Sequence, residues 1–305
     1  MMDAVTPRTL GEALTGGPVV LDGGVATELE RRGHDLSGAL WSARLLRDDP
    51  AAIEAVHAAY AGAGAQVVTT ASYQATFEGF ARAGLDAGTT ERLLRSSVEL
   101  ARRGAPDAWV AGSVGPFGAL LADGSEYTGG YATDLGVAGL RRFHRRRMQV
   151  LAEAGVDVLA CETVPAAAEA EALVAEAQSL GVPIWLSLTT VVDDDGVVRT
   201  RRGEPAADVF AMAAGVDEVL AVGLNCTDPS GVPAAVTTAA ASGKPVVVYP
   251  NSGEGWDASG RRWTGEAMRA TDDVPRWVAA GARLVGGCCR IGPDRIRQIA
   301  AALPR

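Results

Sequence analysis

Short, nearly continuous apolar runs recur along the chain, each a few residues after a glycine. The repeat is clearest in AGAGAQVVTT, EAGVDVLACE, SLGVPIWLSLTT, AAGVDEVLAVGLNC, ASGKPVVVYPN and AAGARLVGGCC, at Gly64, Gly155, Gly181, Gly215, Gly243 and Gly281. A glycine can end a helix in the left-handed conformation without the steric cost of a Cβ atom. A run that is apolar at successive positions is typical of a strand buried on both faces, as in a parallel sheet. The pattern therefore predicts repeated helix–glycine–strand units.

Two further runs, VVLDGG from Val19 and AWVAGSVG from Ala108, bring the predicted strands to eight. Helical patterns lie between them, at residues 50–63, 89–103, 135–154, 166–179, 206–214, 232–242, 274–280 and 293–303. This alternation favours an α/β fold, a (β/α)8 TIM-type barrel, over an open doubly wound sheet. A nucleotide-binding open sheet would want GxGxxG after its first strand, whereas DGGVATE has only two adjacent glycines. We expect a single domain spanning residues 1–305.

Two longer segments interrupt this alternation, residues 115–134 and residues 251–273. Both are rich in glycine and turn residues, and both contain aromatic side chains. Loops that follow barrel strands lie on the catalytic face, and long loops in compact domains are usually functional or mobile. We therefore expect both segments to contribute to a site.

The balance of 37 acidic against 28 basic residues gives a net charge of −9, which provides no attraction for nucleic acid or an anionic membrane. No apolar run approaches the roughly 18 to 20 residues of a membrane span. The first residues lack the basic and apolar regions of an export signal. We expect a cytoplasmic protein that acts on small molecules, with no nucleic-acid or membrane partner. Its four cysteines are then expected as thiols rather than disulfides.

The cysteines all fall near the predicted carboxyl ends of strands, where barrel enzymes carry their chemistry. Cys226 ends the sixth strand, and Cys288 and Cys289 follow the eighth. Three thiolates would leave one of the four tetrahedral positions of Zn²⁺ open, as in a catalytic zinc site. The alternatives for the vicinal pair are small buried side chains or a redox disulfide. Cys161 as a fourth ligand would close the site, and we interpret it instead as a buried structural thiol.

Two carboxylates also end strands, Asp22 after the first and Glu162 after the fourth. They could form a general acid–base pair, a divalent-cation site or a cradle for a substrate ammonium, and thiolate-bound zinc favours the cradle. The backbone N–H groups of Gly23, Gly24 and Val25 could bind a carboxylate. A helix N-cap is the structural alternative for Asp22. Together these groups describe a site for an amino acid that bears a thiol.

The histidines and the arginine run are expected to lie outside this chemistry. By pattern, His34 and His57 belong to surface loops or helices, and His144 lies within RRFHRRRMQ. We interpret that run, residues 141–147, as a solvated helix face with salt bridges.

The strand-end motifs together resemble one family, the zinc-dependent homocysteine S-methyltransferases. The matching segments run from residue 21 to residue 290 and comprise LDGGVATELERRG, LWSARLL, VTTASYQA, SVGPFGA, DGSEYTGGY, ETVP, GLNCTDP, YPNSGEGWD and VGGCCR. The resemblance implies a (β/α)8 barrel in which zinc is held by Cys226, Cys288 and Cys289. It also implies that homocysteine is bound by Asp22 and Glu162 at its ammonium and by Gly23, Val25 and Ser42 at its carboxylate, with Tyr73 and Asn225 completing the substrate-binding residues.

Within the family, the segment DGSEYTGGY is most similar to the short enzymes that use S-methylmethionine. The resemblance implies methyl transfer from a sulfonium, S-methylmethionine or S-adenosylmethionine, to zinc-bound homocysteine thiolate to give methionine. Candidate aromatic contacts to the sulfonium, through cation–π interaction, are Tyr73, Tyr127, Trp41 and Trp256.

Two other functions stay open at this point, a betaine-dependent methyltransferase and a non-catalytic zinc- or thiol-binding protein. Betaine-using relatives tend to carry tyrosine where this chain has Thr163, and a C-terminal extension where it stops at Arg305. Both differences favour a sulfonium donor.

Overall fold

The computed structural model describes residues 9–36, 40–257, 262–265, 267 and 270–304. Within them, eight parallel strands form one sheet in the order β1-β12-β9-β8-β5-β4-β3-β2. Their bounds are β1 Val19–Val20, β2 Val67–Thr69, β3 Trp109–Val114, β4 Val158–Val164, β5 Ile184–Leu188, β8 Val219–Asn225, β9 Val246–Tyr249 and β12 Ala282–Val285. A parallel bridge between Leu21 and Val67 joins the two edges, so the sheet closes into a barrel.

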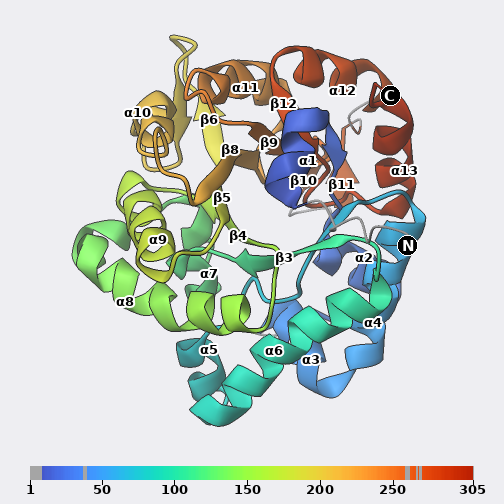
Figure 1. The fold of residues 1–305 in the computed structure, drawn as a ribbon, viewed down its shortest axis with the longest axis vertical. Helices are drawn as coiled ribbons and strands as arrows, with labels where there is room; N and C mark the ends of the chain where they lie inside the picture. Colours follow the sequence, from blue (N-terminus) through green and yellow to red (C-terminus); the bar gives the residue numbers. More distant parts are fainter. Residues whose placement is uncertain (1–8, 37–39, 258–261, 266, 268–269, 305) are drawn as a thin grey trace, which may run out of the picture.

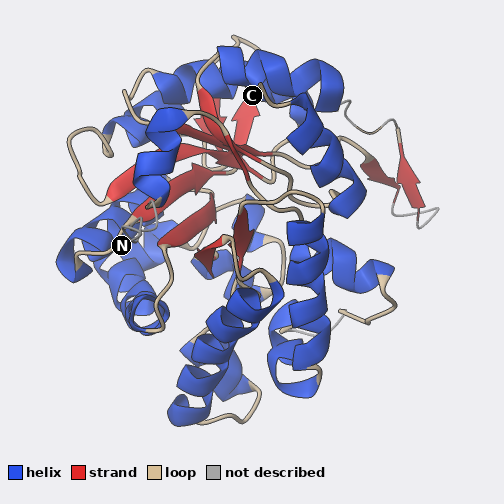
Figure 2. Cartoon of the chain, turned by 45° about the vertical axis from the view of Figure 1, so that its right-hand side comes forward, coloured by secondary structure: helices blue, strands red, loops and turns tan. Residues whose placement is uncertain are grey.

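Helices surround these strands on the outside (Figures 1 and 2). The α-helices are α1 Leu10–Gly16, α2 Val25–Arg31, α3 Leu45–Asp48, α4 Pro50–Gly62, α5 Phe77–Arg82, α6 Ala87–Gly104, α7 Phe117–Leu121, α8 Ala132–Glu153, α9 Ala167–Leu180, α10 Ala206–Ala211, α11 Val232–Ala240, α12 Ala270–Ala279 and α13 Pro293–Ala302. Three 3-10 turns join them, η1 Trp41–Arg44, η2 Ser125–Tyr127 and η3 Pro229–Gly231. Among the described residues, no helix has the length and apolar character needed to cross a membrane.

The predicted (β/α)8 barrel is confirmed. Each of the eight predicted strands overlaps a barrel strand, and each of the eight predicted helices overlaps a helix. The glycines expected to end helices all have positive φ, from 62° at Gly181 to 121° at Gly281. These glycines fix where each helix stops and the chain turns back toward the barrel.

Several elements were not predicted, among them the short helices α3, α5 and α7, one further helix and two hairpins. Helix α1 precedes the first strand, and its capping box between Thr9 and Glu12 is a sequence signal that we did not use. A hairpin of β6 Thr190–Val192 and β7 Val198–Thr200 follows the fifth barrel strand. A second hairpin, β10 Gly255–Asp257 and β11 Arg262–Thr264, lies in the segment 251–273 and stands away from the barrel (Figure 2).

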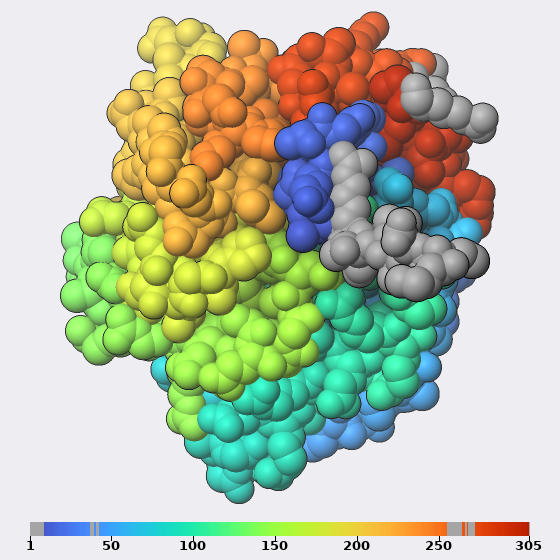
Figure 3. Space-filling model, in the orientation of Figure 1, coloured from blue at the N-terminus to red at the C-terminus, as the bar shows by residue number. Residues whose placement is uncertain are grey.

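Helix α1 covers the end of the barrel at which the strands begin. Its buried Leu10, Ala13 and Leu14 join one apolar cluster with inward-facing residues of the strands, such as Val67 and Trp185. In Figures 1 and 3 the dark blue helix lies on the front face between the orange-red C-terminal part and the green part of the chain. The interior of the barrel is therefore packed and closed at this end.

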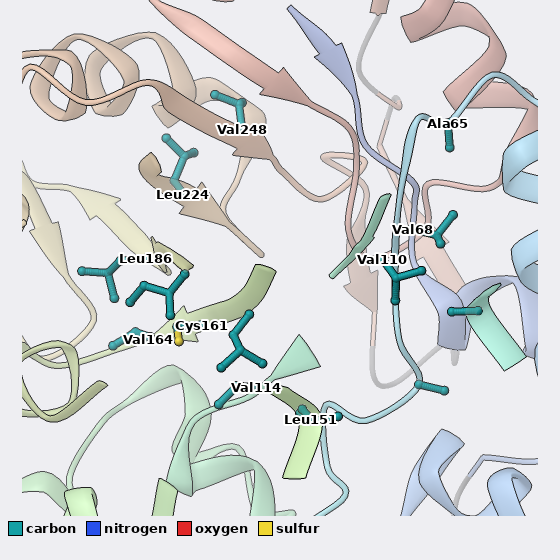
Figure 4. Packing of buried hydrophobic residues seen from close by; sticks show 14 of the residues in the cluster. Ala65, Val68, Val110, Val114, Leu151, Cys161, Val164, Leu186, Leu224 and Val248 are labelled. Carbon is teal, nitrogen blue, oxygen red and sulfur yellow. The ribbon is translucent and has the colours of Figure 1, made fainter. Parts of the chain in front are cut away.

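A second, larger core lies between the strands and the helices, and it contains Cys161. Successive residues of a strand point to opposite faces. Ala160 accordingly joins the interior cluster, whereas Leu159 and Cys161 pack in the outer core. Figure 4 shows the Cys161 sulfur among apolar side chains that include Val164 and Leu186. The same alternation turns Glu162 toward the barrel interior.

The expected surface positions of two histidines and one arginine are wrong. His57 on α4 and His144 on α8 are each 0% exposed, and Arg147 is 1% exposed. His144 lies 2.9 Å from a Glu169 oxygen and 2.7 Å from Arg147 Nη2, which also donates to the Gly115 carbonyl. Burial lowers the pKa of each histidine to about 4. The helix periodicity did not reveal that this stretch of α8 faces inward.

The rest of the arginine run lies at the surface as predicted. Arg141 and Arg145 pair with Glu176 at 2.6 and 2.7 Å, and Arg146 pairs with Glu91 at 2.7 Å.

Candidate active site

A cavity opens at the end of the barrel at which the strands finish. Its wall is formed by residues that follow the strand ends, including Asp22, Thr69, Ser113, Glu162 and Cys226, together with part of the segment 115–134. Acidic side chains and cysteines line it, whereas no lysine, arginine or histidine is among its described lining residues. An interior of this kind favours ligands that carry positive charge.

Three cysteine sulfurs meet in this cavity, as the sequence predicted. Cys226 Sγ lies 2.7 Å from Cys288 Sγ and 3.9 Å from Cys289 Sγ, and the vicinal sulfurs are 4.0 Å apart. A tetrahedral zinc with Zn–S bonds of about 2.3 Å would separate its sulfur ligands by about 3.8 Å. Two separations fit that geometry, and the third would have to open by about 1 Å. The donor set therefore fits a metal that prefers thiolates, and Cys161 is outside it.

The three thiols share negative charge unequally. Hydrogen bonds from Cys226 and then Cys288 lower the pKa of Cys289 well below its usual value, and Tyr127 adds a third. Hydrogen bonding to the other sulfurs, together with burial, raises the pKa of Cys288. The cluster thus already stabilises a thiolate at Cys289, the form in which cysteine binds metals.

The loop after β9 holds the vicinal pair in place. The N–H of Cys288 donates to the Pro250 carbonyl at 2.8 Å, and the N–H of Cys289 donates to Asn251 Oδ1 at 3.1 Å. The YPN and GGCC motifs are therefore parts of one structure, although 38 positions separate Asn251 from Cys289.

The backbone is strained next to the reactive groups. Two non-glycine residues of the cavity wall have left-handed φ values, 60° at Thr163 and 48° at Cys226, and so does Arg290, which follows Cys289, at 66°. Such conformations cost of the order of 1 kcal/mol or more each, and they cluster at functional sites. The Asn225 amide holds Thr163 by two hydrogen bonds, because its Oδ1 accepts from Thr163 N–H and its Nδ2 donates to Thr163 Oγ1, both at 2.7 Å.

Asp22 is buried in the cavity wall, 2% exposed. Its carboxylate accepts from the Thr69 N–H at 2.7 Å and from the Thr69 hydroxyl at 3.1 Å. Burial raises the pKa of Asp22 well above its usual value despite these bonds. The N-cap of α2 is Gly24 rather than Asp22, so the structural alternative for this aspartate is wrong.

Glu162 faces the same cavity from the end of β4, 8% exposed. Burial raises its pKa to about 7, although hydrogen bonds from Ser113 and Tyr249 act in the opposite direction. A substrate ammonium placed between Glu162 and Asp22 would restore the charged form of both, because a nearby cation favours an ionised carboxylate.

Close backbone approach brings the ends of β1 and β12 together. A Cβ atom on Gly24 would lie 2.7 Å from the Cys288 carbonyl oxygen, so only glycine fits there. On the opposite side, a Cβ on Gly115 would lie 2.7 Å from atoms of Tyr73. The DGG and GPFG motifs therefore place Asp22 beside the cysteines and the Tyr73 ring in the wall.

The predicted carboxylate-binding groups are only partly available. Gly23 and Val25 line the cavity, but the N–H of Gly24 donates to the Ile291 carbonyl at 3.1 Å. The side chain of Ser42 lies outside the described residues.

Two of the four aromatic candidates, Tyr73 and Tyr127, line the cavity. Burial raises the pKa of Tyr73 well above its usual value, and the charges of Cys226 and Glu126 raise it further. The side chains of Trp41 and Trp256 lie outside the described residues.

Four cavity residues were missed as participants. Three of them, Thr69, Ser113 and Tyr249, bond to the cradle carboxylates; the strand-end rule singles out their positions in the sequence, but it predicts no role for them. The fourth, Glu126, lies on η2, where no strand-end position singled it out.

A parallel barrel that brings three cysteines able to hold a metal and two buried carboxylates into one cavity at the carboxyl ends of its strands has the architecture of a small-molecule enzyme. The family model for homocysteine S-methyltransferase matches residues 19–303. The chain belongs to the homocysteine S-methyltransferase family, and it is a methyltransferase.

Relatives of similar length support this assignment. The chain is 44% identical to homocysteine S-methyltransferase 4 of Zea mays, over 94% of this chain and 90% of the relative. It is 42% identical to the selenocysteine Se-methyltransferase of Brassica oleracea var. italica, over 93% of this chain and 88% of the relative. Among solved structures, the homocysteine methyltransferase MmuM of Escherichia coli in its metallated form has a TM-score of 0.83 at 42% identity, covering 93% of this chain and 96% of that one.

Proposed function

We propose that this protein transfers a methyl group from a sulfonium donor to the thiol of homocysteine and thereby forms methionine. The observation that carries the proposal is the convergence of Cys226, Cys288 and Cys289 with two carboxylates in one cavity. A thiol-binding metal site explains the cysteines, and an amino-acid substrate explains Asp22 and Glu162. A sensor of zinc would need only the first.

We propose zinc as the metal held by the three cysteines, because three sulfurs leave one tetrahedral position for a substrate. Bound zinc would supply a lower pKa for the substrate thiol, which at a pKa of about 8.5 is otherwise only a few per cent thiolate at neutral pH. Asp22 and Glu162 would orient homocysteine by its ammonium, and Asn225 would keep the strained wall around them in place.

In the transfer itself, the homocysteine sulfur forms a bond to the methyl carbon while the bond from that carbon to the donor sulfur breaks. The electron pair stays on the donor sulfur, which leaves as a neutral thioether, and the thiol proton is lost to solvent. Opposite charges disappear in this step, so a water-poor cavity favours it. Tyr73 and Tyr127 supply ring faces for the sulfonium, and the fixed wall replaces a bimolecular encounter with an oriented pair.

The remaining expectations are part of the same proposal. We place the whole chain in one barrel domain that works in the cytoplasm on small molecules. The four cysteines are free thiols in the structure, which is consistent with a reducing compartment.

The test follows carbon-labelled homocysteine into methionine by mass spectrometry, with S-methylmethionine, S-adenosylmethionine and betaine offered separately. The proposal predicts labelled methionine with at least one sulfonium and none with betaine. Turnover with betaine alone would show that the donor is a quaternary ammonium and not a sulfonium. No turnover with any donor would overturn the proposed activity. Selenocysteine as an alternative acceptor, suggested by the Brassica relative, belongs in the same panel.

A further inference from the structure

A third acidic residue lines the cavity, in addition to the two carboxylates proposed to hold homocysteine. Glu126 is 4% exposed and lines the same wall as Asp22 and Glu162. Its Oε2 atom is buried without a hydrogen-bond partner among the described residues. A buried acceptor left unpaired costs about 1–3 kcal/mol, and more when it is charged, so this oxygen calls for a ligand.

The position of Glu126 is fixed by its backbone. A Cβ atom on Gly118 of α7 would lie 2.3 Å from the Glu126 nitrogen, so η2 is pressed directly against that helix. Asp123 holds the start of the turn, because its Oδ1 accepts from the Ser125 N–H at 2.9 Å. The segment that carries Glu126 along the cavity wall is therefore held in place by its own packing and hydrogen bonds.

Glu126 forms no ion pair with another described residue. None of the ion pairs formed among the described residues involves it, and no described lysine, arginine or histidine lines the cavity. Burial raises its pKa, and the nearby charges of Asp123 and Cys289 raise it further. The partner that would stabilise the ionised carboxylate is thus a cationic ligand.

Homocysteine supplies one ammonium, for which Asp22 and Glu162 suffice. The methyl donor would bring the second set of positive charges into the cavity. A donor that is an amino-acid sulfonium carries both a sulfonium and an α-ammonium, whereas betaine and simple dialkyl sulfoniums carry only the onium centre.

We propose that Glu126 binds the α-ammonium of the methyl donor and so selects amino-acid sulfoniums over donors without an amino group. This inference rests on the proposed methyl transfer. The ammonium can donate hydrogen bonds to Oε2, which a sulfonium cannot. A carboxylate placed against the sulfonium would also stabilise the positive charge that the reaction removes, and would favour the ground state over the transition state.

Neighbouring residues fit this arrangement. Tyr127 follows Glu126 directly, and its hydrogen bond lowers the pKa of Cys289. The negative charges of Cys226 and Glu126 both raise the pKa of Tyr73. Both aromatic residues thus line the same cavity as the three cysteines and Glu126. A donor bound across them would keep its sulfonium toward the thiol and its ammonium toward Glu126.

The test compares S-methylmethionine with its deamino analogue, 4-(dimethylsulfonio)butanoate, which keeps the sulfonium and the carboxylate. Both donors are assayed at saturating homocysteine with zinc-loaded wild type, Glu126→Gln and Glu126→Asp. Asp123→Asn is the matched control, because it removes one negative charge from an exposed position of the same loop and keeps an oxygen for Ser125.

Glu126→Gln should lower kcat/KM for S-methylmethionine by about 30-fold or more, the loss expected for one hydrogen-bonded charge pair. It should change kcat/KM for the deamino analogue by less than about threefold and leave the KM for homocysteine unchanged. Glu126→Asp should fall between these values with S-methylmethionine, and Asp123→Asn should behave as wild type.

Equal losses with both donors, or a raised KM for homocysteine, would overturn the role of Glu126. Zinc content and thermal unfolding of each variant separate misfolding from lost recognition. If Glu126→Gln does not fold, calorimetry compares the affinity for S-methylmethionine of wild type with that of Glu126→Asp, which should be lower. A wild type that methylates homocysteine with neither donor, nor with S-adenosylmethionine, would instead refute the proposed function itself.

Discussion

At the end where the barrel strands begin, α1 covers an apolar interior in which Leu10, Leu14 and Trp185 are almost fully buried. At the other end, the same strands finish in carboxylates, thiols and left-handed residues around an anionic cavity. Apolar side chains buried from water stabilise the fold at the first end. Buried carboxylates and strained backbone lower the stability of the fold at the second end. Substitutions at the first end should therefore change the free energy of unfolding, and substitutions at the second end should change substrate binding and activity.

Removing the metal should have the largest effect, and on activity alone. Without it the substrate thiol is only a few per cent ionised and loses an anchoring contact, so methionine formation should fall by about 10³-fold or more. Dialysis against a chelator, followed by addition of Zn²⁺, measures this loss and its recovery. An undiminished rate in metal-free protein would contradict the account.

Leu14→Ala, at the end where the strands begin, should lower the stability of the fold and leave the activity unchanged. Truncating a leucine that is 3% exposed should lower the free energy of unfolding by about 2–5 kcal/mol. Urea unfolding measures this change, while kcat and zinc content should equal those of wild type. A lower kcat in the folded variant would show that the two ends are coupled.

Asp22→Asn is the counterpart at the cavity. Removing one partner of the ammonium should raise the KM for homocysteine about 30- to 300-fold, with zinc content unchanged. Since burial raises the pKa of Asp22, its charge costs stability in the empty protein, and the free energy of unfolding should stay constant or increase. Loss of zinc together with stability would make Asp22 structural.

The smallest effect concerns pH. The proposed partner of the homocysteine ammonium is the ionised form of Glu162, whose pKa burial raises to about 7. Lowering the pH from 7 to 6 reduces that form from about half to about a tenth, so the KM for homocysteine should rise about fivefold. In Glu162→Gln the KM should be high and independent of this step. The thiol 4-sulfanylbutanoate, which lacks the ammonium, serves as the control, and an equal rise with it would assign the pH effect to the thiol.

The sequence allowed most of the framework of both ends to be predicted. Glycines, which adopt the left-handed conformation without steric cost, marked helix ends, and continuous apolar runs marked buried strands, because both signals are local. The strand-end rule then placed Asp22, Glu162 and three cysteines together before any coordinates were considered. Strand alternation would also have shown that Cys161 and Glu162 face opposite ways.

What could not be predicted depends on long-range packing. The burial of His57, His144 and Arg147 follows from how α4 and α8 sit against the barrel, which no local pattern of charges records. The presentation of Glu126 depends on contact between η2 and Gly118. The cover formed by α1 was signalled by its capping box, but its place over the strand starts follows only from the closed barrel.

The central claim, that three of the four cysteines form a catalytic zinc site and the fourth is a core residue, is tested most directly by replacing each with alanine. Zinc per chain, measured by mass spectrometry, should be close to one in wild type and Cys161→Ala and near zero in the Cys226, Cys288 and Cys289 variants. Labelled methionine formation should follow the zinc content in all five proteins. Zinc retained with full activity in Cys226→Ala, or lost in a folded Cys161→Ala, would contradict the account.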